Sequence, residues 1–175
     1  MNENEMRLTQ DRLAAQILER HGDLGSLMLI GLERRGSDLA KRLAEALEAK
    51  SGVKIPHGSL DINLYRDDWT RLASGSPHIG KSSIPKNPDG MNVLLVDDVL
   101  FSGRTIRAAL EALLDYGRPA KVELLVLIDR GHRELPIAAD YIGGHVQAPK
   151  EAHVDVLFKE RDGRDAVILS LPGGN

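Results

Sequence analysis

The chain has 175 residues, of which 42% are hydrophobic and 28% are charged. This length suffices for one domain with a hydrophobic core, and this balance excludes a wholly disordered chain. The net charge of −3 at pH 7 excludes a strongly basic nucleic-acid-binding coat, although a local basic patch is compatible with it. Because the chain lacks cysteine, disulfides, thiolate zinc sites and cysteine nucleophiles are excluded.

Two further features concern the compartment. No apolar run approaches the length that crosses a membrane, so we expect no membrane span. Residues 1–7 are polar and acidic, unlike the basic start of a secretory signal. Together these features predict a cytoplasmic protein.

The first two predicted elements are a helix and a buried strand. Apolar residues recur near helical spacing at Leu8, Leu13 and Ile17, and Gly22 provides a stop. The continuous apolar run 27–30 is typical of a strand that is buried on both faces.

A second helix and a second strand follow. Ser37 is suited to cap a helix whose apolar positions run to Leu47, and Ser51 and Gly52 close that helix. Residues 60–64 alternate between apolar and polar, which predicts a half-exposed strand.

The middle of the chain contains a long polar stretch and then three regular elements. Residues 66–90 are rich in Gly, Ser and Pro and show little periodicity, so we interpret them as a mobile lid loop. Residues 93–96 predict a buried strand, residues 103–116 a helix and residues 122–128 a third buried strand.

The chain ends in a predicted β-hairpin over residues 153–169, with a turn at residues 162–163. Strands that alternate with helices predict an α/β fold, a mostly parallel central sheet flanked by helices. We expect residues 1–175 to form one domain that carries the lid loop and the C-terminal hairpin.

Three polar segments directly follow the predicted parallel strands. They are residues 33–36, the pair Asp97 and Asp98, and residues 129–131. Ligands of such sheets bind beyond the carboxyl ends of the strands. The three segments therefore predict one shared site.

Residues 93–105 carry the strongest signal. A buried strand delivers Asp97 and Asp98, and a short loop of small and hydroxylated residues then opens directly into a helix. A helix start suits a phosphate, while adjacent carboxylates suit vicinal hydroxyls, a magnesium shell or a developing positive charge. This combination indicates a ribose 5-phosphate. The structural alternative is that the carboxylates only cap the loop and that Ser102 caps the helix.

Two arginines beside Gly36 could bind a pyrophosphate, because guanidinium groups make bidentate contacts to phosphate. A solvated turn with surface arginines explains the same residues equally well. The histidines show no spacing typical of a transition-metal site.

The pattern as a whole resembles a known family. Residues 93–105 resemble the phosphoribosyl-diphosphate (PRPP) motif of type I phosphoribosyltransferases. Residues 58–68 and 128–136 resemble the PyrR family more specifically, and the resemblance extends over about residues 12–169. It implies a uracil phosphoribosyltransferase that converts uracil and PRPP to UMP and pyrophosphate with Mg²⁺. It also implies UMP-dependent binding of pyrimidine-operon leader mRNA, which attenuates transcription, and a homodimer or larger assembly.

The resemblance also implies roles for individual residues. Asp97, Asp98 and Arg66 are expected to be catalytic, with Mg²⁺ carried by the substrate and held by Asp97 or Asp98. The residues expected to bind PRPP or UMP are Arg34, Arg35, Val99, Leu100, Phe101, Ser102, Gly103, Arg104, Thr105 and Arg130. The residues expected to bind RNA are Arg12, Arg20, His132, Arg133 and Lys150.

The chain departs from the family pattern at several positions. Arg34 stands where relatives usually have Thr, Asp11 and Ala15 where they have Thr and His, and Ala138 where they have Arg. The last three changes remove donors or add a negative charge, so we expect weaker RNA binding. Two alternatives stay open: an RNA-binding attenuator with vestigial catalysis, and a transferase for another base without RNA regulation.

Overall fold

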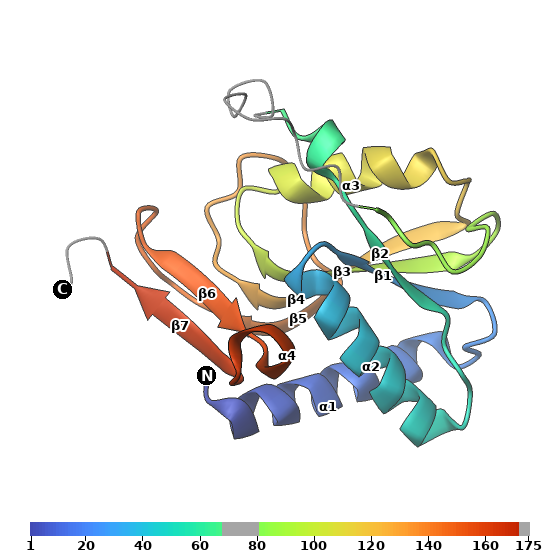
Figure 1. The fold of residues 1–175 in the computed structure, drawn as a ribbon, viewed down its shortest axis with the longest axis horizontal. Coiled ribbons are helices and arrows are strands. Elements are labelled where there is room, and N and C mark those ends of the chain that lie inside the picture. The colour runs from blue at the N-terminus through green and yellow to red at the C-terminus, as the bar shows by residue number, and fades with distance from the viewer. Residues whose placement is uncertain (68–80, 172–175) are drawn as a thin grey trace.

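A five-stranded parallel sheet forms the centre of the structure (Figure 1). The computed structural model describes residues 1–67 and 81–171. The strands lie in the order β2-β1-β3-β4-β5, and every neighbouring pair is parallel. Their bounds are β1 Leu27–Leu32, β2 His57–Leu60, β3 Asn92–Leu100, β4 Lys121–Asp129 and β5 Tyr141–His145.

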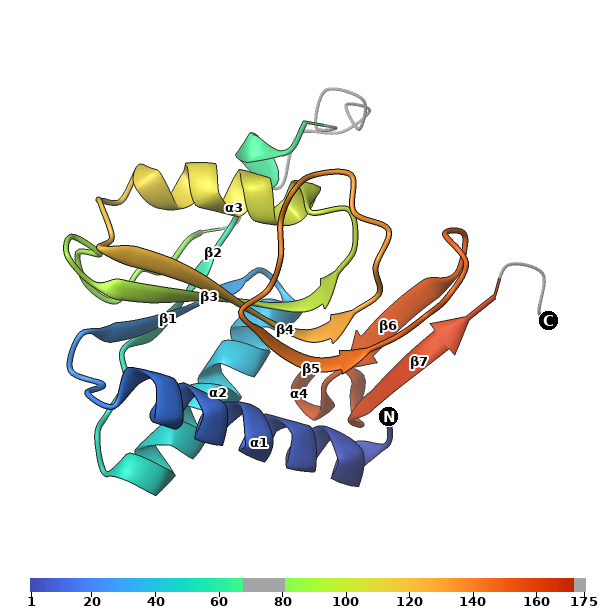
Figure 2. The ribbon, with the colours of Figure 1, turned by 180° about the vertical axis from the view of Figure 1, so that it is seen from behind.

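Helices cover both faces of this sheet. Helices α1 (Glu3–His21) and α2 (Arg35–Ser51) lie on one face, and α3 (Arg104–Leu114) lies on the other (Figures 1 and 2). The short 3-10 helix η1 (Asn63–Tyr65) lies beside α3. Outside the sheet, β6 (His153–Leu157) and β7 (Ala166–Ser170) form an antiparallel hairpin, with α4 (Lys159–Asp162) between them. The predicted α/β architecture with a C-terminal hairpin is confirmed.

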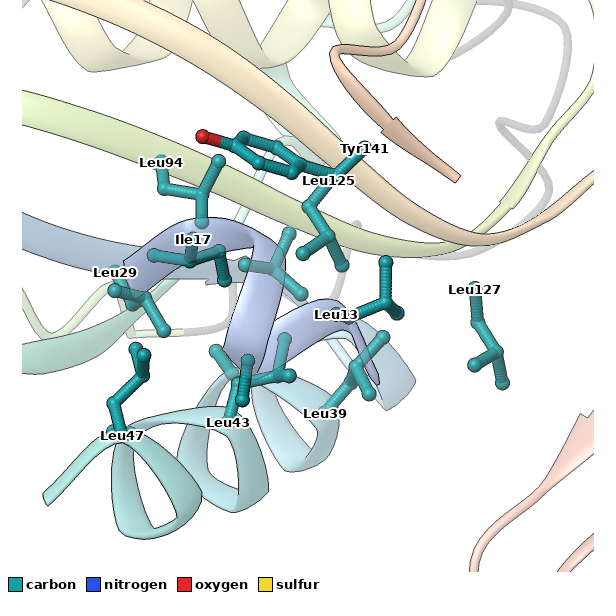
Figure 3. Close-up of a cluster of buried hydrophobic side chains, with 14 of the residues drawn as sticks. Leu13, Ile17, Leu29, Leu39, Leu43, Leu47, Leu94, Leu125, Leu127 and Tyr141 are labelled. Carbon is teal, nitrogen blue, oxygen red and sulfur yellow. The ribbon is translucent and has the colours of Figure 1, made fainter. Parts of the chain in front are cut away.

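Two clusters of buried side chains hold the layers together. The cluster between the sheet and helices α1 and α2 includes Leu13, Ile17, Leu29, Leu43 and Leu94 (Figure 3). The cluster under α3 includes Met28, Leu95, Ile106, Ala109 and Leu113. All six residues of β1 are buried because both faces of the sheet are covered, which explains its continuous apolar sequence.

Helix α1 starts earlier than the apolar spacing indicated. Asn2 accepts a hydrogen bond of 2.9 Å from the backbone N–H of Glu5, whose carboxylate accepts one of 2.8 Å from the N–H of Asn2. This capping box fixes the helix start. The helix buries Met6 and Ile17, whereas Leu8 is 51% exposed and does not belong to the buried face.

The predicted N-cap of the second helix, Ser37, was wrong by three residues, because the N-cap is Arg34. Helix α2 begins at Arg35, and the hydroxyl of Ser37 donates a 2.6 Å hydrogen bond back to the carbonyl oxygen of Arg34. Ser37 therefore lies inside the first turn and does not cap it.

The predicted strand 60–64 was also wrong. Strand β2 ends at Leu60, because the side chain of Asp61 accepts a 2.9 Å hydrogen bond from the N–H of Asn63. This local turn leads the chain into η1 instead of extending the sheet.

Strand β5 was missed by sequence reasoning because two glycines interrupt its pattern. A Cβ atom on Gly143 would clash with the carbonyl oxygen of Leu127 in β4 and lie 2.9 Å from the Cγ2 atom of Thr9 in α1. Glycine here allows α1 to pack closely over the sheet edge.

The predicted lid loop is only partly described, since its residues 68–80 lie outside the described ranges. After this gap, Ser83 forms an antiparallel bridge to Ser59 at the end of the sheet. Across the described ranges, no helix combines the length and the apolar character that crossing a membrane requires.

The packing of α1 predicts that alanine substitutions at two of its aliphatic residues, Ile17 and Leu8, change the stability to different extents. Ile17→Ala is expected to lower the free energy of unfolding by about 2–5 kcal/mol, because it leaves a cavity in the core. The matched variant Leu8→Ala, on the exposed face, is expected to change it by less than about 0.5 kcal/mol. Equilibrium urea unfolding measures both values, and equal losses would contradict the assigned face of α1.

Candidate active site

The parallel register brings the three predicted polar segments to one edge of the sheet. Gly31 of β1 is paired with Val96 of β3, and Leu100 of β3 is paired with Asp129 of β4. Residues 33–36, the acidic pair and residues 129–131 consequently lie at the carboxyl ends of three neighbouring strands. Their predicted convergence is confirmed.

The acidic pair lies inside β3, which continues to Leu100 instead of ending at residue 96. Asp97 is 7% exposed, and its Oδ1 atom accepts a 3.0 Å hydrogen bond from the N–H of Asp98. Burial and then repulsion from Asp98 raise the pKa of Asp97 well above its usual range. Burial also raises the pKa of Asp98, against its hydrogen bonds and the charge of Arg35. Such a pair is suited to bind hydroxyl donors or a cation.

The loop formed by residues 33–36 packs directly against this pair. A Cβ atom on Gly36 would lie 2.5 Å from the carbonyl oxygen of Val96 and 3.2 Å from the Cα atom of Asp97. A Cβ atom on Gly31 would clash with the carbonyl oxygen of Gly36. Two glycines thus allow the loop to touch the acidic strand, and the role of Gly31 was not predicted.

The two arginines of this loop differ in their surroundings. Arg34 is exposed, and its carbonyl oxygen accepts hydrogen bonds from Ser37 and from Arg161. Arg35 is half-buried, and its Nη2 atom lies 3.1 Å from Oδ1 of Asp162 in α4. The alternative of a solvated turn therefore describes Arg34 but not Arg35.

The segment predicted to bind phosphate lies where β3 ends and α3 begins. Gly103, the N-cap residue of α3, has a φ of +91° and no side chain to block the first N–H groups of the helix. The carbonyl oxygen of Ser102 accepts hydrogen bonds of 2.9 and 3.2 Å from the N–H groups of Glu134 and Leu135. The hydroxyl of Ser102 accepts only a long bond of 3.3 Å from the N–H of Arg104; Gly103 is the N-cap residue, so the predicted alternative that Ser102 caps the helix was wrong. Thr105 is exposed at the helix start.

Arg104 joins three parts of the site edge. It forms an ion pair with Asp67, at the base of the predicted lid, and a second one of 2.8 Å with Glu134. Glu134 also lies 3.3 Å from the Nζ atom of Lys150. Arg66, the expected catalytic residue of the lid, directly precedes Asp67, so this network holds its backbone near the start of α3.

Arg130 is a structural clamp at the same edge. It is 6% exposed and donates hydrogen bonds to the carbonyl oxygens of Ala152 (2.6 Å), Pro149 (3.0 Å) and Lys150 (3.1 Å). Its guanidinium lies 4.2 Å from the ring centroid of Phe101. It thereby ties the loop around residue 150 to the segment predicted to bind phosphate.

A cavity of about 690 Å³ opens beside this clamp. Its lining includes Asp129, Arg130, Gly131, His132, Arg133, His145, Val146, Gln147 and Ala148. The ring of His132 lies 2.8 Å from the carbonyl oxygen of Ala148. Arg133 donates to Asp129 and to the carbonyl oxygen of Phe101; although burial acts to raise the pKa of Asp129, this contact with Arg133 lowers it. The cavity is large enough for a small aromatic ligand.

The five residues expected to bind RNA fall into two groups. Arg12 and Arg20 lie on α1, where Arg12 donates to the carbonyl oxygen of Gly143 and Arg20 forms ion pairs with Glu123 (3.1 Å) and Asp140 (3.2 Å). The other three are His132, Arg133 and Lys150, which lie around the cavity and its edge. Every one of the five already has an acceptor within the protein.

The donor set fits a magnesium ion that arrives with its substrate. The described ranges contain no group of three or more His, Cys, Asp or Glu side chains able to hold a metal ion by themselves. Mg²⁺ commonly uses one or two carboxylates together with substrate phosphates. Asp97 and Asp98, which precede the open start of α3, would provide those two carboxylates.

Comparisons with known proteins agree with this geometry. Residues 4–161 match the family model for the phosphoribosyl transferase domain. The chain is 53% identical over 162 residues to the bifunctional protein PyrR of Desulfosudis oleivorans, covering 92% of this chain and 89% of that protein. It is 47% identical over 175 residues to the bifunctional protein PyrR of Chloroflexus aurantiacus, covering 100% and 96%.

A solved structure shows the same fold at lower sequence identity. The hypoxanthine phosphoribosyltransferase of Trypanosoma cruzi, in complex with the product IMP, has a TM-score of 0.72 at 20% identity. The similarity covers 98% of this chain and 89% of that one.

The raised pKa of Asp97 predicts a pH-dependent gain in stability for Asp97→Asn. The folded state holds the proton of the Asp97 carboxyl more tightly than the unfolded state does. The stability of the wild type therefore falls as the pH rises from the ordinary pKa of Asp in the unfolded chain toward the raised pKa in the folded protein. Asn cannot ionise, and it retains the Oδ1 acceptor for Asp98. We expect its melting temperature to exceed that of the wild type by about 2 °C or more at pH 7. The gain should vanish below about pH 4, where the Asp97 carboxyl is protonated in both the folded and the unfolded state. A gain that does not depend on pH would contradict the ionisation of Asp97 as its cause.

Proposed function

The chain belongs to the PyrR family of phosphoribosyltransferases, and we propose that the site described above carries the two activities of that family. The protein is bifunctional: a uracil phosphoribosyltransferase and a regulator of the pyrimidine operon. The observation that carries the residue assignment is the buried pair Asp97 and Asp98, which lies in β3 just before the open N-terminus of α3.

The ribose 5-phosphate of PRPP binds across this segment. The N–H groups at the start of α3 and the hydroxyls of Ser102 and Thr105 bind the phosphate. Asp97 and Asp98 bind the ribose hydroxyls, and the negative charge that the pair carries stabilises the cationic sugar that forms as the bond from C1 to pyrophosphate loosens. C1 then exchanges its bond to a pyrophosphate oxygen for a bond to a uracil nitrogen, and that nitrogen releases its proton to solvent.

The leaving pyrophosphate is bound by the loop of residues 33–36, through the backbone at Gly36 and the charge of Arg35. Arg66 acts on it from the lid. When bound with PRPP, Mg²⁺ supplies positive charge to the pyrophosphate oxygens, and Asp97 or Asp98 would hold it. No covalent nucleophile is required, because positioning and electrostatics carry the reaction.

Uracil binds in the cavity beside Arg130. Phe101 and Arg130 stack at its edge, and the carbonyl oxygens that Arg130 holds in place fix the loop around residue 150. This rigid wall supports selection of the base by the shape of the cavity.

The regulatory activity requires leader RNA at the outer surface. The five residues named above already contact internal acceptors, and Asp11 adds a negative charge that pairs with Arg7 at 3.0 Å. RNA phosphates must compete with these partners, which supports weaker RNA binding than in relatives with the full set of cations. Residues 1–175 act as one domain, in the cytoplasm, and as a homodimer or larger assembly.

The enzyme assignment is tested by Mg²⁺-dependent release of pyrophosphate from PRPP, with uracil compared against other bases. Asp98→Asn is expected to lower kcat by about 10²–10³-fold, because it removes a charge that stabilises the transition state. Asp155→Asn, at an exposed position of β6, is the matched control and should retain wild-type turnover. If the protein is folded and binds UMP but shows no turnover with any of the bases tested, the enzyme assignment is contradicted.

The RNA surface is tested by adding back a missing cation. Ala138 is exposed, and Ala138→Arg is expected to tighten binding of pyrimidine-operon leader RNA about fivefold in the presence of UMP. The dependence of log K on log salt should become steeper by about 0.7–0.9, as one phosphate contact requires. Val53→Arg, exposed after α2, adds the same charge elsewhere and should not change this slope. Fluorescence anisotropy over a salt series measures both variants; an equal effect would assign the gain to net charge alone.

A further inference from the structure

The turn α4 is tied to helix α2 by a group of ion pairs. Arg42 of α2 bonds to the carboxylates of Glu160 and Asp165 at 2.6–2.9 Å. Arg161 of α4 forms an ion pair with Asp38, in the first turn of α2. Contacts at two positions along α2 therefore fix the turn relative to residues 33–36, which lead into that helix and include its first two residues.

Asp162 of this turn contacts the loop itself. Its Oδ1 atom lies 3.1 Å from Nη2 of Arg35, and its Oδ2 atom accepts a 2.9 Å hydrogen bond from the backbone N–H of Phe158. Phe158 is fully buried, so the second bond anchors the carboxylate to the core. The bond from Phe158 lowers the pKa of Asp162 more than burial raises it, and Arg35 lowers it further, so this group is ionised at neutral pH.

Arg35 is held at two points. Its backbone is fixed because Gly36 packs against Val96, and its guanidinium is bound by Asp162 on one side. The charge of Arg35 also acts on Asp98, whose pKa it lowers against the effect of burial. Its Nε atom is buried and has no hydrogen-bond partner within residues 1–67 and 81–171. An unpaired donor of this kind is stabilised when an anion binds next to it.

We propose that Asp162 is a positioning residue that holds Arg35 in the orientation that receives the leaving pyrophosphate. This inference rests on the proposed function and extends its site to the C-terminal hairpin. A free arginine side chain has many rotamers, and the loss of this freedom on binding weakens affinity. Asp162 removes that freedom before the ligand arrives, so the turn α4 acts on pyrophosphate without touching it.

The test compares Asp162→Ala with Glu160→Gln. Both variants remove one ion pair between α4 and α2, but only Asp162 contacts Arg35. Asp162→Ala is expected to raise KM for PRPP, and for pyrophosphate in the reverse reaction, by about three- to tenfold, with KM for uracil unchanged. Glu160→Gln should leave all three values unchanged. In an Arg35→Ala background, Asp162→Ala should produce no further rise.

Calorimetric titration of the free protein with magnesium pyrophosphate gives a second readout that does not need turnover. A selective loss of pyrophosphate affinity in Asp162→Ala supports the proposal. Wild-type affinity in Asp162→Ala, or an equal loss in Glu160→Gln, would overturn it, since the second result assigns the effect to a loosened hairpin. If the wild type lacks turnover with uracil, the proposed function fails, while the titrations still decide the role of Asp162.

Discussion

Two adjacent carboxylates lie inside the parallel strand β3, where burial raises the pKa of each, and the neighbouring elements are built around them. Burying two adjacent carboxylates costs stability, which supports the proposal that this pair serves the chemistry of the site. The surroundings of the pair compensate only part of the cost of burying two carboxylates. Backbone N–H groups of Asp98 and Val99 donate to the carboxylates, and Arg35 brings a positive charge near. The remaining negative charge is available to a sugar that becomes cationic.

Arginine connects the loops of this site. Arg104 links the lid base to the start of α3, Arg130 links the loop around residue 150 to Phe101, and Arg35 links the loop of residues 33–36 to α4. Loops that carry a site need rigid support from the scaffold, and a guanidinium with several donors can join distant backbone segments. The same side chains thus build the site and supply its positive potential.

The residues assigned to the two activities lie in different surroundings, so we expect the departures of this chain from its family to affect the two activities differently. Catalysis depends on groups buried in the sheet, and the acidic pair and the helix start that follow the family pattern are intact. RNA binding depends on exposed cations, and here Arg12 and Arg20 are bound to the backbone of β5 and to the buried carboxylate of Glu123. Surface charge can therefore change while the catalytic geometry does not.

The sequence alone determined the α/β class, the buried strands and the segment of residues 93–105, because apolar periodicity and strand-to-helix loop chemistry are local properties. It also placed the loop of residues 33–36 beside the acidic pair, since parallel strands end at one edge. Only the tertiary structure decided which helix face is buried, as the exposed Leu8 shows, and that Gly143 belongs to a strand under α1. It also decided that Asp162, 127 residues from Arg35, contacts the guanidinium of that residue. Contacts at such separations depend on how the layers pack, and no local pattern encodes them.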